Sequence, residues 1–231
     1  MKKIFAISDL HGQLDNLDPS GNDIVVIAGD FAPLKRLDKY GIHDQCKWIN
    51  TIFYKFTSKY PEIDFVITPG NHDLALDILK TFPYKDISLK TRFSENVHLL
   101  LDQEIEIKGL KIYGTPWVPI INYMWAFEAD HIKLVEKFKK IPEKLDILIT
   151  HAPPRIPNEQ IDFSIQTNYG PFGSSELTNA ILEKQPKNVF CGHIHSGKHG
   201  KIEFNGSNLY NVSRLNEDYC ISYEPTIIEL L

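Results

Sequence analysis

Seven side chains that can bind a metal ion stand just after five short apolar segments of this 231-residue chain. They are Asp9, His11, Asp30, Asn71, His151, His193 and His195. Taken singly, each has an ordinary explanation, because Asp and Asn are common in turns and a lone histidine after a strand is more often structural than functional. Turn formation gives no reason, however, for all five segments to end in metal-binding atoms. The pattern therefore predicts a single site assembled from across the chain.

The number and type of these side chains predict two divalent ions. Seven donors exceed the four that one zinc-like ion takes in a tetrahedral site. Carboxylate oxygen, amide oxygen and imidazole nitrogen without sulfur favour Mn, Fe, Zn, Co or Ni. Asp30 is the lone donor of its segment and is the natural bridge between the ions. Two ions about 3.5 to 4 Å apart stabilise both oxygens of an in-line displacement and lower the pKa of a bridging water, which is chemistry suited to phosphoester hydrolysis.

The apolar segments themselves predict buried strands. Their ranges are 4–8, 24–28, 65–68, 147–150 and 189–191. Each is nearly continuous in Ile, Val, Phe and Leu rather than alternating with polar residues, which is typical of strands covered on both faces. In open α/β sheets, ligands bind beyond the carboxyl ends of the strands. Five such ends can therefore direct their polar residues into one crevice.

Helices and hairpins are predicted between and after these strands. Three helices are predicted at 42–56, 74–82 and 128–140. The third has an apolar stripe of Ile132, Val135 and Phe138. A fourth helix is predicted to be capped by Ser174 or Ser175 and to continue through Leu177, Ile181 and Leu182. Segment 104–113 alternates on both sides of Lys108 and Gly109, which is typical of a hairpin. Short strands are predicted at 201–204, 209–212 and 226–230. We therefore expect an α/β fold with mixed sheets whose faces are covered by helices.

Composition bounds the number of domains and the kinds of partner. With 42% apolar residues the chain can bury one sizeable core, so we expect a single domain over 1–231. A net charge of −5 and a pI near 6.0 do not favour nucleic acid as a partner. No apolar run approaches the ~20 residues of a membrane span. Because Cys46, Cys191 and Cys220 form no CxxC pattern, we expect reduced thiols and a cytoplasmic protein. Oligomeric state leaves no mark in the sequence.

Five short motifs are similar, in order and approximate spacing, to those of the calcineurin-like metallophosphoesterases. They are DLHG at 9–12, GD at 29–30, GNHD at 70–73, TH at 150–151 and GHIH at 192–195. Further stretches, GTPWVP at 114–119, HAPP at 151–154 and NVSRLNEDY at 211–219, resemble the branch that includes the vertebrate metallophosphoesterase-domain-containing proteins and small bacterial relatives. The resemblance implies a four-layer α/β/β/α sandwich with two mixed β-sheets.

The resemblance also implies roles for individual residues. The first ion would be held by Asp9, His11, Asp30 and His195, and the second by Asp30, Asn71, His151 and His193. His72 matches the family's histidine that contacts the phosphate and protonates the leaving alkoxide, so His72 and Asp30 are the expected catalytic residues. A positioned imidazole is a common proton donor, and an alkoxide leaves poorly without one.

These features together predict a dinuclear-metal-dependent phosphoesterase that acts on small molecules. Phosphodiesters such as cyclic nucleotides are the expected substrates. The Ser/Thr protein phosphatases of the superfamily continue the GD motif as GDxVDRG, whereas this chain reads GDFAPLKR at 29–36, so protein phosphatase activity is not expected. The open alternatives are a non-catalytic binding scaffold with the same fold, a phosphomonoesterase and a nuclease.

Arg155 and Trp117 are weaker candidates for substrate binding. Arg155 could contact phosphate, and Trp117 could stack on a nucleobase, a contact worth about 1 to 3 kcal/mol per base. The ordinary alternatives are a surface charge for Arg155 and a core or interface aromatic for Trp117. His199, which follows the last motif, is expected in an exposed loop.

Overall fold

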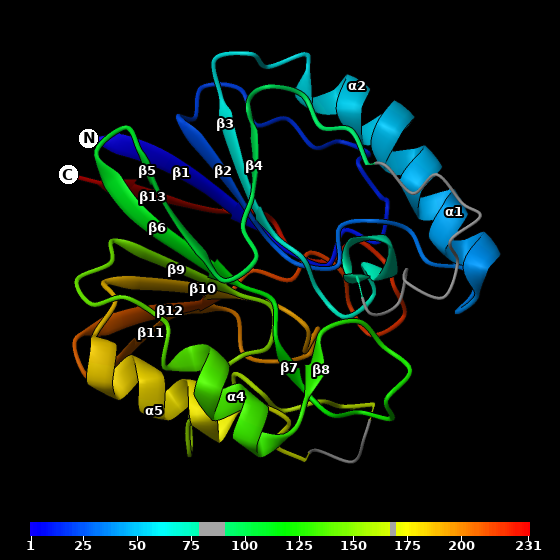
Figure 1. Cartoon of the computed structure of the whole chain (residues 1–231). Helices are drawn as coiled ribbons and strands as arrows, with labels where there is room; N and C mark the ends of the chain where they lie inside the picture. Colours follow the sequence, from blue (N-terminus) through cyan, green and yellow to red (C-terminus); the bar gives the residue numbers. More distant parts are fainter. Residues whose placement is uncertain (79–90, 167–169) are drawn as a thin grey trace.

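Two β-sheets pack face to face, and helices cover the outer face of each (Figure 1). This computed structural model describes residues 1–78, 91–166 and 170–231. In spatial order, the first sheet consists of β13 (Thr226–Leu230), β1 (Lys2–Ile7), β2 (Ile24–Ala28), β3 (Asp64–Thr68) and β4 (Val97–Leu99). The second consists of β11 (Gly200–Phe204), β12 (Ser207–Asn211), β10 (Asn188–Cys191), β9 (Ile147–Thr150), β6 (Leu110–Thr115) and β5 (Gln103–Ile107). β7 (Val118–Pro119) and β8 (Glu128–Ala129) form a separate pair.

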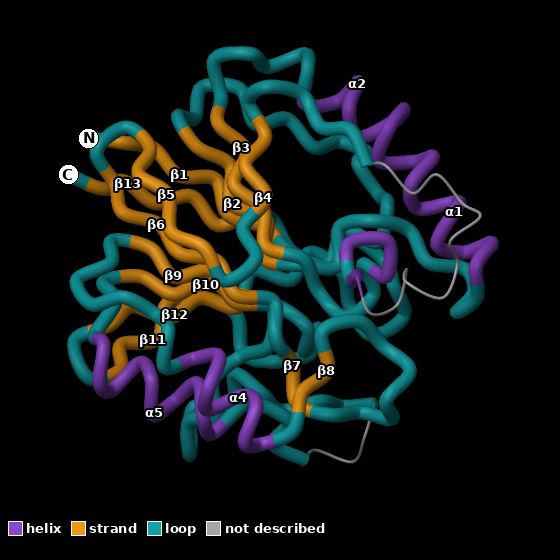
Figure 2. Tube along the Cα trace, in the orientation of Figure 1, coloured by secondary structure: helices purple, strands orange, loops and turns teal. Residues whose placement is uncertain are grey.

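Helices form the two outer layers (Figure 2). The first sheet is covered by one continuous helical segment made of α1 (Lys39–Trp48), the π-helical η1 (Ile49–Phe53) and α2 (Tyr54–Thr57). The second sheet is covered by α4 (His131–Phe138) and α5 (Ser175–Lys184). The expected α/β class with two mixed sheets is therefore confirmed, including the hairpin of β5 and β6 that was predicted at 104–113.

Parallel strands occupy the centre of each sheet. β1, β2, β3 and β4 run parallel, and only β13 is antiparallel to its neighbour. In the second sheet β12, β10, β9 and β6 run parallel, while the edge strands β11 and β5 return as hairpins. The carboxyl ends of the parallel strands of both sheets thus lie at one edge of the sandwich, where polar side chains from distant parts of the chain can meet.

Alternate residues of one strand enter different layers of the core. Phe5 and Ile7 of β1 pack beneath the helical segment, whereas Ile4 and Ala6 enter the layer between the two sheets. The third layer, between the second sheet and its helices, contains Leu134, Phe138, Leu148, Leu177 and Val189. Because successive side chains of a strand point to opposite faces, a central strand that is covered on both sides must be apolar at every position. This is why the strand sequences show continuous apolar runs.

The predicted apolar stripe of α4 is wrong in two of its three positions. Ile132 and Val135 are 70% and 46% exposed, whereas Leu134 and Phe138 are buried. The helix also starts later than expected: Glu128 belongs to β8, and the Asp130 carboxylate caps the helix by accepting from the N–H of Lys133. The buried face is formed by residues four positions apart, Leu134 and Phe138, whereas the prediction followed a spacing of three; both spacings are compatible with an amphipathic helix.

The other predicted helices agree more closely with the structure. The helical segment predicted at 42–56 spans 39–57 and is capped by Asp38. Ser174 caps α5 as expected, but Leu182 is 41% exposed and Ala180 takes its place on the buried face. Of the helix predicted at 74–82, a 3-10 turn at Leu74–Leu76 is present, and positions 79–82 lie outside the described residues.

We expect Leu134→Ala to destabilise the protein by about 2 to 5 kcal/mol, because a buried leucine leaves a cavity when it is truncated. The matched change Ile132→Ala on the exposed face of the same helix should stay within about 0.5 kcal/mol of wild type. Urea unfolding followed by circular dichroism measures both. Equal losses from the two variants would contradict the assignment of the buried face.

Candidate metal centre

The seven predicted ligands meet at the shared edge of the two sheets. Each follows the carboxyl end of β1, β2, β3, β9 or β10. Ser8 joins the sheets here: its N–H donates to the Val212 carbonyl at 2.8 Å, and its carbonyl accepts from the N–H of Arg214 at 3.0 Å. Ligands that are far apart in the sequence are therefore brought together by the backbone itself.

Four of the ligands have left-handed backbone. The φ angles are 52° at Asp9, 42° at His11, 51° at Asp30 and 70° at His193. Side chains other than glycine rarely adopt this conformation, which costs of order 1 kcal/mol or more per residue and persists only where the surroundings enforce it. Here the N–H of Asp9 donates to the Gly29 carbonyl at 3.0 Å, and that of His11 donates to the Asp30 carbonyl at 2.9 Å. Each strand thus turns sharply at its end and aims the side chain into the site.

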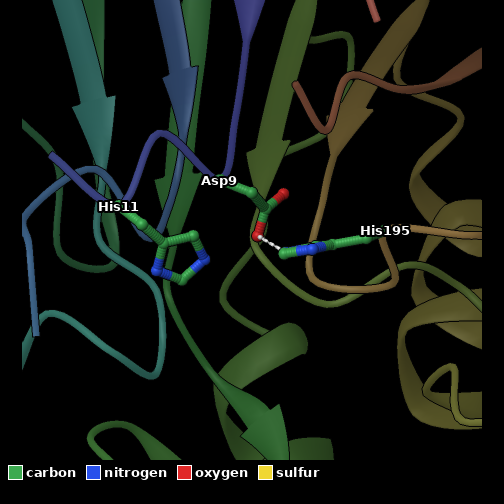
Figure 3. A group of neighbouring side chains, drawn as sticks. All are labelled: Asp9, His11 and His195. Carbon is green, nitrogen blue, oxygen red and sulfur yellow. Dashed lines mark ion pairs between the residues drawn. The ribbon is translucent and has the colours of Figure 1, made fainter. Parts of the chain in front are cut away.

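Asp9, His11 and His195 form the first group of ligands (Figure 3). Their ligand atoms all lie within 4.8 Å of one another. His195 Nε2 is 3.4 Å from Asp9 Oδ1, and the two rings flank the Asp9 carboxylate (Figure 3). Asp30 Oδ2 lies 3.9 Å from His11 Nε2, so Asp30 reaches this group as the sequence predicts.

The second group forms on the other side of Asp30. His151 Nε2 lies 3.2 Å from Asp30 Oδ2 and 3.0 Å from Asn71 Oδ1. The His193 ring is 4.9 Å from the His151 ring between centroids, and the His193 N–H donates to the Asp9 carboxylate at 3.0 Å. Asp30 therefore stands between the two predicted sets of ligands.

The imidazole nitrogens are arranged as metal ligands require. Nδ1 of His151 donates to the Ala28 carbonyl and Nδ1 of His195 to the Asn216 carbonyl, both at 2.9 Å. These bonds orient each ring and leave Nε2 for a metal ion. His11 Nε2 is buried and has no hydrogen-bond partner among the described residues, which is costly unless an unseen partner satisfies it. The residues therefore fit divalent ions.

Charge balance in this buried cluster keeps the carboxylates ionised. Burial alone would raise the pKa of Asp9 and of Asp30, but the neighbouring His195 and His151 hold both well below their usual range. Burial would lower the pKa of the two histidines, yet the same carboxylates raise each to about 9. Burial outweighs the attraction of Asp30 and Asp9 at His11, where the nearer carboxylate oxygen is 3.9 Å from Nε2, and lowers the pKa of His11 to about 4. The two carboxylates are therefore ionised and able to bind cations. Without a metal ion, their negative charges are neutralised by the protonated rings of His151 and His195.

Two glycines let the ligands approach so closely. A Cβ at Gly192 would overlap Ser8 Oγ and Asp9 Oδ2. A Cβ at Gly29 would overlap His151 Nδ1, and the φ of +93° at this residue also disfavours any other side chain. The glycines of the GD and GHIH motifs are therefore required by space as well as by backbone conformation.

Several residues that orient the ligands were missed in the sequence. The hydroxyls of Ser8 and Ser213 donate to Asp9 Oδ2 at 2.6 and 2.7 Å. Gln45, which is fully buried, donates to the His72 carbonyl at 2.6 Å. Asp73 accepts from the N–H groups of Gly70 and Ala32 and so fixes the turn that carries Asn71; burial and the nearby Asp30 raise the pKa of Asp73 to about 7. The only sequence feature that pointed to Ser213 is the NVSRLNEDY stretch at 211–219, which contains it.

A cleft of about 420 Å³ opens onto these ligands. Asp30, Asn71, His193 and His195 line its floor together with His72. The walls include Pro119, Ile120, Ile121, Trp125, Phe172, Glu217 and Tyr219. This volume is in the range of small-molecule sites.

Trp117 and Arg155 are not found among the described residues that line the cleft. The Trp117 indole donates to the Asp102 carboxylate at 2.9 Å and packs beneath the ammonium groups of Lys133 and Lys137. The backbone N–H of Arg155 donates to Ser174. His199 is half-buried rather than exposed, because its ring stacks on Tyr223 with centroids 3.6 Å apart. Trp125, eight residues after Trp117, lines the cleft instead.

The family follows from comparison with known proteins. A model of the calcineurin-like phosphoesterases matches residues 2–197. The chain belongs to the calcineurin-like phosphoesterase family. It is 30% identical over 250 residues to metallophosphoesterase domain-containing protein 1 of Homo sapiens, covering 99% of this chain and 71% of the relative. It is 28% identical over 190 residues to a probable glycerophosphodiester phosphodiesterase of Arcobacter nitrofigilis, covering 79% of this chain and 59% of the relative.

A solved structure of a calcineurin-like fold extends the comparison to three dimensions. The phosphopantetheinyl hydrolase of Mycobacterium tuberculosis superposes with a TM-score of 0.53 at 16% identity, covering 91% of this chain and 88% of that one. At this level the likeness shows the fold alone. In the described part of this family member, no helix is long and apolar enough to cross a membrane.

We expect His193→Ala and His195→Ala each to lose a different ion, since His195 Nε2 lies 3.4 Å from Asp9 Oδ1, whereas the His193 ring packs against the ring of His151. Each variant should retain about one ion per chain, and wild type about two, by elemental analysis after dialysis. Cys191→Ala, a change to the buried last residue of β10, should retain both. Loss of both ions in either histidine variant, with the fold intact, would contradict the assignment to separate sites.

Metal affinity should increase as the pH rises towards 9. The pKa of His151 and that of His195 are both about 9 in the metal-free protein, so both rings carry protons at pH 7 that an ion must displace. Linkage then gives up to about a hundredfold tighter summed binding per pH unit, flattening above pH 9. Calorimetry of Mn binding in two buffers of different ionisation enthalpy counts the protons. Binding without proton release between pH 6.5 and 8 would contradict this charge balance.

Proposed function

We propose that the protein is a dinuclear-metal-dependent phosphoesterase that hydrolyses small phosphodiesters such as cyclic nucleotides. The observation that carries the proposal is the position of Asp30. It lies within 4.0 Å of the ring nitrogens of His11, His72 and His151, and so links the predicted ligands of both ions to the predicted proton donor. Mn, Fe, Zn, Co and Ni all suit the donor set.

When bound, the two ions would neutralise phosphate oxygens and make water nucleophilic near neutral pH. Residues of the chain hold the ions and supply the proton for the leaving group. Asp9, Asp30 and the five other ligands hold the ions in place. His72 lines the cleft, and its Nε2 lies 4.0 Å from Asp30 Oδ2, beside the predicted ligands of both ions. As water adds to phosphorus and the P–O bond breaks, the leaving oxygen takes the proton from His72 Nε2; the proton that the water loses passes to solvent, from which His72 is protonated again.

The charge of the cleft favours a diester over a monoester. Among the described residues that line it, none is Lys or Arg, and Glu217 adds an acidic side chain. A monoester brings nearly two negative charges at neutral pH, whereas a diester brings one. The apolar wall of Pro119, Ile120 and Phe172 offers a surface for the second ester group. The name of the Arcobacter relative, a probable glycerophosphodiester phosphodiesterase, supports the same class.

The same features disfavour the alternatives. A nuclease needs a basic groove along which a strand can lie, and the cleft of about 420 Å³ has no such lining in the described residues. A non-catalytic scaffold has no need to keep seven ligands and a histidine in one buried cluster. Cys46, Cys191 and Cys220 are free thiols, which supports the cytoplasm as the location.

We expect the protein loaded with Mn, Ni or Co to hydrolyse bis(p-nitrophenyl) phosphate and a cyclic nucleotide, with kcat/KM at least about tenfold above that for p-nitrophenyl phosphate. Asp30→Asn should lower the activity by about a hundredfold or more, because it removes the shared carboxylate. Release of nitrophenolate and of nucleoside monophosphate provides the assays. Absence of hydrolysis with every ion, or equal activity in Asp30→Asn, would refute the proposal. Preference for the monoester would refute only the diester class.

A further inference from the structure

Trp125 packs directly against the proposed proton donor. The indole of Trp125 and the imidazole of His72 stack with ring centroids 4.3 Å apart and planes inclined by 27°. Both rings line the cleft. A stacked ring covers one face of the imidazole, and Nε2, on the edge of the imidazole ring, lies 4.0 Å from Asp30 Oδ2.

One carboxylate fixes the segment that carries Trp125. Oε1 of Glu128 accepts from the backbone N–H groups of Ile121, Asn122 and Tyr123 at 2.6, 2.8 and 3.1 Å. Its Oε2 accepts from the N–H of Trp125 at 2.9 Å. Hydrogen bonds to an ionised acceptor are stronger than neutral ones. Four of them that converge on one side chain hold segment 121–125 in a single conformation.

The backbone of His72 is held just as firmly. Its N–H donates to Asp30 Oδ1 at 2.8 Å, and its carbonyl accepts from the buried Gln45. The N–H of Ala126, which follows Trp125, donates to the carbonyl of Asn71 at 3.0 Å. This bond ties the Trp125 backbone to that of His72. The stacking of the two rings is therefore imposed by the backbone on both sides.

We infer that Trp125 and Glu128 are positioning residues that hold the His72 ring at the angle needed to protonate the leaving group. This inference rests on the proposed function. A misplacement of about 1 Å at a reacting group can cost a hundredfold in rate. The His72 ring is fixed at its backbone, and its side-chain torsions are restrained by the face of the indole. Glu128 acts one step further away, since it sets the position of the indole.

The dependence on leaving group separates positioning from substrate binding. With a nitrophenolate leaving group little proton donation is needed, whereas the alkoxide leaving group of a cyclic nucleotide requires it. Trp125→Ala should lower kcat for the cyclic nucleotide by about ten- to a hundredfold, and for bis(p-nitrophenyl) phosphate by less than about threefold. Trp125→Phe should restore most of the loss, and Glu128→Gln should reproduce part of it. Met124→Ala, a change to the exposed neighbour outside the cleft, is the control.

Nuclear magnetic resonance tests the same inference without activity. In protein freed of paramagnetic ions, the Cε1–H resonance of His72, assigned by its loss in His72→Ala, should be displaced by the ring current of Trp125. It should move in Trp125→Ala and Glu128→Gln, but not in Met124→Ala. The positioning role would be overturned if the His72 resonance did not move in Trp125→Ala. It would also be overturned if this variant lost kcat/KM equally with both esters through a higher KM. Inactivity of the wild type with every ion would instead refute the proposed function, and a shifted resonance in the variants would still establish the contact.

Discussion

The buried Asp30 carboxylate is the interaction on which the rest of the site depends. It is 2% exposed, lies within 4.0 Å of ring nitrogens of His151, His72 and His11, and accepts from the backbone N–H of His72. A buried charge is tolerated only when partners surround it in good geometry, and it is strongly destabilising when one is removed. Those partners come from β1, β3 and β9, and thus from both sheets. The two sheets must therefore be in register with each other before the carboxylate can be ionised without penalty.

The sandwich meets this demand by concentrating unusual backbone at one edge. The interior of each strand is regular, and its side chains alternate between two apolar layers. Left-handed residues and closely packed glycines begin where the strands end. Strain of this kind is tolerated where a large, well-packed core outweighs it. The site is attached to the most buried part of the fold, and the cleft above it is lined mainly by loop residues.

The sequence allows the strands and the ligands to be predicted for the same physical reason. A strand that is buried on both faces must be apolar throughout, so polar residues at its end are conspicuous. The aromatic stretch 117–125 has no such regularity, and whether Trp117 or Trp125 reaches the cleft depends on distant partners: Asp102 for the first and His72 for the second. The prediction placed Ile132 on the buried face of α4, where the structure has Leu134, because either residue fits a helical spacing with Phe138. Ser213 and Gln45 act through contacts with residues far away in the sequence, which no local pattern reveals.

The bridge between Ser8 and Ser213 has a consequence for how the protein comes into being. Asp9 is near the start of the sequence, and the hydroxyl that orients it comes from a residue 204 positions later. Because a ribosome releases the chain from its N-terminus onwards, at about 5 to 20 residues per second, the first ligands wait many seconds for Ser213 and for the Asn216 carbonyl that orients His195. During translation a metal ion could meet only an incomplete set of the predicted ligands, so we expect correct loading to follow the synthesis of Ser213 and Asn216.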